Sequence, residues 1–183
     1  MSDSPLPSVR NASKRFGYVA LIVTVTVGFT IWLLLPVQSN FQKRLLAEGT
    51  TIVSLSGSKL EPAPGFPHPP LIHIDGEFLI AVPEHSVGLT IESRLFKLNV
   101  DAKTALRIVA HSKQAGEQVQ VLYGHVTAAK NYGSANTAPD QLGAGEISMV
   151  NQSIDLMEKE TLKSGELHAL REAFQEYGIE TAP

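Results

Sequence analysis

The longest run of hydrophobic residues predicts a helix that crosses a membrane. It extends from Gly17 to Val37 and contains no charged side chain. At about 1.5 Å of rise per residue, a helix of this length spans roughly 30 Å, the hydrocarbon thickness of a bilayer. Trp32 lies near its far end, where interfacial aromatic side chains are common. A buried core helix is the alternative, but such helices seldom extend so far without a polar face.

The flanking residues predict a permanent anchor rather than a cleaved signal peptide. The run is longer than the apolar part of a signal peptide, and no small-residue cleavage site follows Val37. The flanking cations are Arg10, Lys14 and Arg15 before the run, and Lys43 and Arg44 after it. Short basic segments usually remain in the cytoplasm. We therefore expect a single-pass protein of the inner membrane, with a disordered cytoplasmic head at 1–16 and a periplasmic part from residue 38 onward. A head of this size is too short to fold, so the periplasmic part is expected to carry the function.

Residues 38–70 predict a linker. It contains one short strand, Thr50–Leu55, and then a segment with five prolines, Glu61–Pro70. Proline lacks a backbone donor, so this segment forms neither a helix nor a central strand. An extended loop is the simpler interpretation, and a proline-rich ligand for a partner is the alternative.

Residues 71–150 alternate between apolar and polar positions, which predicts a mainly β domain. The clearest strand is Leu71–Val82, and strands are also expected within 87–91, 94–100, 105–111, 119–129 and 141–150. Such spacing is typical of an antiparallel β-sandwich or roll. Gly76 and Gly124 interrupt strands, as glycines do at bulges or at close backbone contacts. The predicted core of the domain includes Ile74, Phe78, Ile80, Val82, Val121 and Val126.

The last segment, 151–183, changes to a helical period. The run begins near Leu156, and Leu167, Leu170, Phe174 and Tyr177 recur at helical spacing. Ser164 is a candidate N-cap, and Gly178 can end the helix in a left-handed conformation. We expect its apolar stripe to pack on the sheet, with a second copy of the chain as the alternative.

Composition limits the chemistry. The chain carries a formal net charge of −3, and its head holds three of the cations, so the periplasmic part is more acidic still. This charge argues against a nucleic-acid partner. The chain has no cysteine, which excludes disulfides and thiol catalysis.

One cluster of polar residues is a candidate metal site. His73, Asp75 and Glu77 share a strand face, with His68 nearby, but any half-solvated strand has such a face. No nucleophile-elbow, zinc-helix or phosphate-loop motif occurs. We therefore expect no catalytic residue, no metal site and no cofactor, and a protein that is not an enzyme.

Four segments in order resemble the FecR family of envelope sensors and anti-sigma regulators. They are Ile74–Val82 (IDGEFLIAV), Phe96–His111, Val119–Val126 (VQVLYGHV) and Leu142–Glu146 (LGAGE). The resemblance implies a FecR-like β-domain and a signalling role with a protein partner in the envelope. Three family features differ: Lys103-Thr104 stands where the family has Gly-Thr, and neither a cytoplasmic sigma-binding domain nor a C-terminal receptor-binding domain is evident.

Two other functions remain open from the sequence. A transport-bridge protein, like the single-pass jelly-roll subunit of lipopolysaccharide export, also combines one membrane helix with a β-domain of this size. Such a protein needs an apolar groove for acyl chains, and two-sided apolarity occurs here only near residues 105–110. The other possibility is a structural partner in an envelope complex.

Overall fold

The computed structural model describes residues 41–55, 57–65, 67–133 and 138–179. The predicted head and anchor, including Gly17, Trp32 and Val37, lie outside these ranges. Among the described residues, no helix combines the length and the apolarity needed to cross a bilayer.

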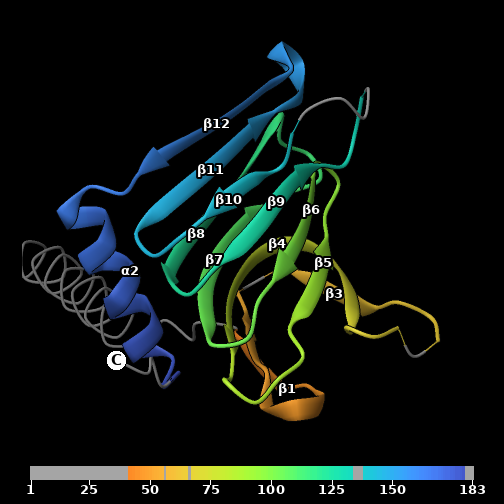
Figure 1. The fold of residues 1–183 in the computed structure, drawn as a ribbon, viewed down its shortest axis with the longest axis vertical. Coiled ribbons are helices and arrows are strands. Elements are labelled where there is room, and N and C mark those ends of the chain that lie inside the picture. The colour runs from red at the N-terminus through yellow and green to blue at the C-terminus, as the bar shows by residue number, and fades with distance from the viewer. Residues whose placement is uncertain (1–40, 56, 66, 134–137, 180–183) are drawn as a thin grey trace, which may run out of the picture. The chain divides into compact units, whose positions relative to one another are not determined.

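The described part of the chain is mainly β, with twelve strands and one α-helix (Figure 1). The strands are β1 (Gln42–Leu45), β2 (Thr51–Ser54), β3 (Lys59–Pro62), β4 (Leu71–Val82), β5 (Leu89–Glu92), β6 (Phe96–Val100), β7 (Thr104–Ala110), β8 (Gly116–Tyr123), β9 (Val126–Lys130), β10 (Asp140–Leu142), β11 (Glu146–Asn151) and β12 (Leu156–Thr161). The helices are α2 (Ser164–Glu176) and two short 3-10 turns, η1 (Ala47–Gly49) and η2 (Gln152–Ile154).

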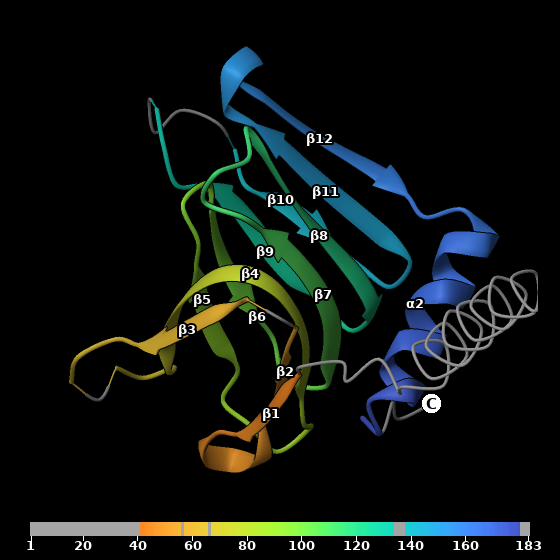
Figure 2. The same ribbon diagram turned by 180° about the vertical axis from the view of Figure 1, so that it is seen from behind.

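The strands form two layers that share β4. Sheet A has the order β1-β2-β4-β7-β8-β11-β12, and sheet B has the order β3-β4-β5-β6-β9-β10. Figure 2 shows β4 curving from one layer into the other. The predicted antiparallel arrangement holds except between β4 and β5, which pair in parallel. That pairing joins the start of β4 to a strand beyond the Pro83–Gly88 loop, a non-local contact that alternation cannot indicate.

Gly76 is the bend at which β4 changes sheets. Residues before it pair with β3 and β5, and residues from Gly76 onward pair with β2 and β7. Its φ of +130° disfavours other residue types, and a Cβ there would lie 2.6 Å from the Cα of Ser58. The Ser58 hydroxyl also donates to the Glu77 carbonyl and accepts from the Glu77 N–H. The expected close backbone contact at Gly76 is therefore present.

Gly124 forms a second corner, between β8 in sheet A and β9 in sheet B. Its φ is +87°, and a Cβ there would lie 2.5 Å from the Lys103 carbonyl oxygen. The bulge itself lies two residues earlier, because the register of β7 with β8 shifts at Leu122. The single strand expected over 119–129 is thus two strands joined by a corner.

Alternation along the strands builds a hydrophobic core between the sheets. All six residues expected in the core lie in this cluster with at most 6 % of their surface exposed: Ile74, Phe78, Ile80, Val82, Val121 and Val126. β7 contributes to both sides of sheet A, with Leu106 and Ile108 in the core and Ala105 in a second cluster. On the outer face only Ala105 is fully buried, since Arg107 and Val109 are half-buried, so the two-sided apolarity of 105–110 reflects full burial of the inner face and partial burial of the outer one.

Two further sequence expectations about element boundaries are wrong. The segment 38–70 contributes three strands, β1 to β3, to the two sheets instead of acting as a linker with one strand. The segment expected to start a helix at Leu156 is instead β12, which forms a hairpin with β11. Pairing with β11 supplies backbone hydrogen bonds that a short isolated helical turn cannot match.

Helix α2 covers part of the outer face of sheet A, as its apolar stripe predicts. Leu170 and Phe174 are buried in the second cluster, with Leu79, Leu122 and Ile147 of the sheet. Ser164 is the first helical residue rather than the cap, and the Lys163 N–H donates to the Glu166 carboxylate at 2.8 Å. The helix ends at Glu176 with Tyr177 as its C-cap, and Gly178 follows in the expected left-handed conformation with a φ of +59°.

Candidate functional site

The outer face of sheet A has a part that α2 leaves open. Register places five residues side by side across β4, β7, β8, β11 and β12, which we call the open row: Glu77, Val109, Gln118, Met149 and Glu158. None of the five is fully buried, although the strands on which they lie contribute to the core on the opposite face. An exposed strip on an otherwise well-packed sheet is a candidate contact surface.

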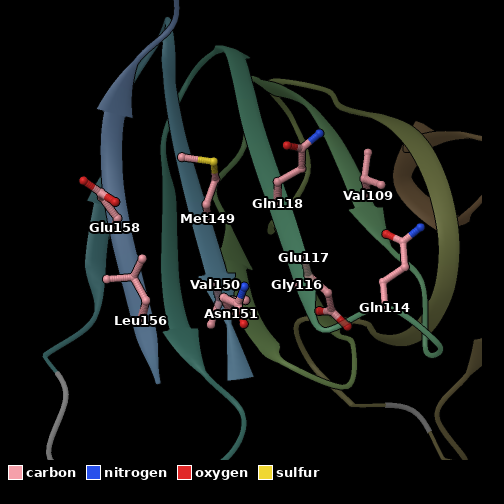
Figure 3. Close-up of a pocket in the computed structure, with 10 residues that line it drawn as sticks. All are labelled: Val109, Gln114, Gly116, Glu117, Gln118, Met149, Val150, Asn151, Leu156 and Glu158. Carbon is pink, nitrogen blue, oxygen red and sulfur yellow. The ribbon is translucent and has the colours of Figure 1, made fainter. Parts of the chain in front are cut away.

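A groove of about 390 Å³ lies along this strip (Figure 3). Its apolar wall comes from Val109, Met149 and Leu156, and its polar wall includes Gln118 and Glu158. The remaining lining residues are Gln114, Gly116, Glu117, Val150 and Asn151. Leu156 is one of the large hydrophobic side chains that the described surface exposes, at 41 %. A mixed apolar and polar lining suits a polypeptide better than a purely apolar ligand.

The charges on this face differ in how they are neutralised. Arg107 binds Glu77, with Nη2 and Nε at 2.5 and 2.7 Å from the same carboxylate oxygen. Glu158 and Glu160 on β12 make no ion pair or side-chain hydrogen bond with any residue that the structure describes. The β12 end of the surface is therefore a region of uncompensated negative charge.

Glu117 lies at the end of the groove, but its carboxylate is buried on the core side of β8. The residue is 4 % exposed, and its Oε2 accepts hydrogen bonds from the Ser93 hydroxyl and the Leu95 N–H. Its Oε1 has no partner among the described residues. Burial raises the pKa of the Glu117 carboxyl, although its hydrogen bonds and the nearby Arg94 act in the opposite direction. Because Ser93 and Leu95 belong to the β5–β6 turn, this carboxyl joins the two sheets.

The three candidate metal ligands His73, Asp75 and Glu77 have separate roles. The bend at Gly76 divides them between the two sheets. His73 lies 3.7 Å from Glu92, Asp75 accepts hydrogen bonds from the backbone and the hydroxyl of Ser112, and Glu77 pairs with Arg107. The Ser112 N–H lowers the pKa of Asp75. In the ranges that the structure describes, no three potential ligands form a group that could hold a metal ion.

A second groove, of about 500 Å³, lies against the proline-rich segment. It is lined by Leu46, Glu48, Pro62, Ala63, Gly65, Pro67, His68, Pro70, Leu71 and Ile72. His68, the fourth residue of the metal hypothesis, lies here. Pro62 ends edge strand β3, a position that proline tolerates because no neighbour needs its missing N–H.

The residues of β12 were not predictable as part of a surface site. The sequence predicts a helix over this segment, although its residues also alternate as in a strand. Leu156, Glu158 and Glu160 share one face, and Met157, Lys159 and Thr161 share the other. A strand pattern was therefore present over six residues, but its polar residues and short length gave it little weight.

The fold is similar to that of solved proteins. Two crystal structures, at 2.50 and 1.65 Å resolution, are of a putative anti-sigma factor from Parabacteroides distasonis ATCC 8503. Each superposes with a TM-score of 0.60 and 16 % sequence identity over 72 % of this chain and 60 % of that chain. No family model matches the sequence, and a search of curated proteins finds no significant match. The described domain thus shares the fold of part of a protein that is described as a putative anti-sigma factor.

Proposed function

We propose that the chain is a FecR-like regulatory protein without enzymatic activity, anchored in the inner membrane with its β-domain in the periplasm. The observation that carries this proposal is the fold likeness to the Parabacteroides protein, together with the order of the four FecR-like segments. The uncharged run Gly17–Val37 supports the anchor.

The FecR-like segments lie at points that define the fold. IDGEFLIAV contains the Gly76 bend, and VQVLYGHV contains the Gly124 corner. LGAGE is the turn before β11, where the Gly143 N–H donates to the Glu146 carboxylate at 2.6 Å and lowers its pKa. The resemblance therefore lies in conformationally demanding positions, and it supports a common fold more strongly than a shared binding partner.

A transport bridge for acyl chains is disfavoured by the packing between the sheets. Large side chains fill this space, with Phe78 and Phe96 at 0 % and Leu98 at 1 % exposure. A lipid-carrying sheet pair needs an open apolar channel there. The two grooves described above lie elsewhere, on the outer face of sheet A and against the proline-rich segment.

A gene deletion tests the proposed function. Removing the gene should change transcription of one set of genes that share promoter elements of an alternative sigma factor, and the full chain should restore it. A transcriptome in which no promoter class responds, under conditions where the protein is made, would contradict a regulatory role.

A further inference from the structure

Among the strands that the structure describes, β12 lies at the margin of sheet A and pairs on one side of its backbone only. Figure 1 shows no strand beyond it, and its strand pairing is with β11. The Leu162 N–H donates to the Gly145 carbonyl at 2.8 Å, and this bond shows which residues of β12 turn their backbone groups toward β11. Since hydrogen-bonded pairs alternate in an antiparallel ladder, Met157, Lys159 and Thr161 direct their N–H and C=O groups away from β11.

The side chains of β12 give this edge a specific chemical character. On the outer face, Leu156 is followed by Glu158 and Glu160, at the two-residue spacing of a strand. Both carboxylates lack partners among the described residues. On the other face, the Lys159 ammonium already has partners within the chain. Its Nζ lies 3.2 Å from the Glu146 carboxylate and donates to the Gln141 carbonyl.

We propose that the free edge of β12 binds an extended segment of a partner protein that carries basic side chains at two alternate positions and an apolar side chain at the next. The inference rests on the proposed function, in which the domain acts through protein contacts. The segment would add a strand to sheet A through the free groups of Met157, Lys159 and Thr161. Its basic residues would lie opposite Glu158 and Glu160, and its apolar residue would lie beside Leu156 at the groove.

The charges on β12 also select among occupants. A second copy that paired through its own β12 would bring glutamates close to glutamates, and like charges across strands are destabilising. Nucleic acids and anionic lipid surfaces carry the same sign of charge as this edge. A basic strand satisfies both the open backbone groups and the unpaired carboxylates.

Binding of a designed peptide tests the proposal. The probe is a labelled peptide with arginine, arginine and leucine at successive alternate positions and threonine between them, added to the purified full chain in lipid nanodiscs. Fluorescence anisotropy should show saturable binding. Thr161→Pro should raise Kd at least about tenfold, because proline removes an outward N–H that β11 does not use. Thr161→Ala retains this N–H and should leave Kd nearly unchanged.

A charge reversal on β12 provides a second test of peptide binding. Glu158→Lys with Glu160→Lys should abolish binding of the arginine peptide and create binding of the same peptide with glutamates in place of arginines. If Thr161→Pro does not fold, hydrogen exchange on the unaltered chain replaces it, and the peptide should then slow exchange at Met157, Lys159 and Thr161.

Three results would overturn the assignment. They are no saturable peptide binding, equal binding to the proline and alanine variants, and concentration-dependent protection of β12 in the protein alone, which would assign the edge to a second copy. The peptide assay measures binding and the gene deletion measures transcription. A negative result in the peptide assay would therefore overturn the binding site without affecting the proposed regulatory function.

Discussion

At the scale of single residues, Glu117 shows the energetic cost of joining the two sheets through a carboxylate. Burial opposes its charge, and only one of its oxygens is hydrogen-bonded to described residues. A carboxyl whose pKa is raised on folding favours the folded state below its unfolded pKa. That contribution is lost as the pH rises through the folded pKa.

Glu117→Gln should therefore stabilise the protein relative to wild type more at neutral than at acidic pH. The amide oxygen can still accept from Ser93 and Leu95, while the ionisation is removed. Thermal unfolding of both proteins at about pH 4 and about pH 7.5 gives the comparison. A difference in Tm that does not change with pH would show that Glu117 does not carry this cost.

Phe78 tests the assignment of strand faces in β4. Its ring is 0 % exposed in the core between the sheets, whereas Thr90 on β5 is half-buried and its hydroxyl faces Asn99. Phe78→Ala should cost about 3–5 kcal/mol of unfolding free energy, and Thr90→Ala under about 1 kcal/mol. Chemical denaturation measures both values, and equal, small losses would mean that the faces are wrongly assigned.

The core residues were predictable because alternation is a local signal. Ile74, Phe78 and Ile80 could be placed on one face from spacing alone. The role of Glu117 was not predictable, since its partners Ser93 and Leu95 lie more than twenty positions earlier, in a turn of the other sheet. Nothing in the sequence near Glu117 distinguishes it from an exposed glutamate on a strand.

At the scale of elements, the end of α2 is fixed by a Schellman motif. The Ile179 N–H donates to the Phe174 carbonyl and the Gly178 N–H to the Gln175 carbonyl, both at 3.0 Å. Ile179 is buried with Phe174 in the second cluster, which is the apolar contact that accompanies this motif.

Two glycines, one in the first turn of α2 and one just beyond its C-terminal end, should respond oppositely to the same substitution. Gly178→Ala should cost about 1–2 kcal/mol, because φ is positive there. Gly165→Ala should stabilise the protein by up to about 1 kcal/mol, since Gly165 is helical. A Cβ at either position meets no atom within 4 Å, so steric clashes do not contribute to the difference in stability between the two variants. Denaturant midpoints measure both, and a stabilising Gly178→Ala would contradict the left-handed cap.

The elements that sequence reasoning placed wrongly are those whose pairing is non-local. β1 and β3 become strands because β2 and β4 lie beside them. β12 becomes a strand because β11 precedes it, although its residues also fit a helical period in part. The helix over 164–176 was predictable because its stripe and its terminal glycine are local features.

At the scale of the whole molecule, the mainly β architecture followed from the alternation, but the assignment of the strands to the two sheets did not. That partition depends on the bend at Gly76 and the corner at Gly124, where φ is positive and the backbone of another segment lies close. Glycines at such points could be recognised from sequence, but the segments that they contact could not.

The proposed topology is tested by a reporter. Alkaline phosphatase, which is active only outside the cytoplasm, should be active when fused after Pro183. This expectation follows from the basic residues Arg10, Lys14 and Arg15 before the uncharged run. A cytoplasmic reporter fused at the same place serves as the control. Activity of the cytoplasmic reporter alone, in a stably made fusion, would reverse the orientation.

The central claim is that the β-domain carries the regulatory function, and domain replacement tests it most directly. Transcription from the responsive promoters is measured in a deletion strain that carries one of two chains. In one, residues 2–13 are replaced by an unrelated polar sequence, with Lys14 and Arg15 kept. In the other, residues 39–183 are replaced by an unrelated β-domain behind the same anchor. We predict that the first chain restores regulation and the second does not. Restoration by the second chain, or loss of regulation with the first despite normal membrane insertion, would contradict the claim.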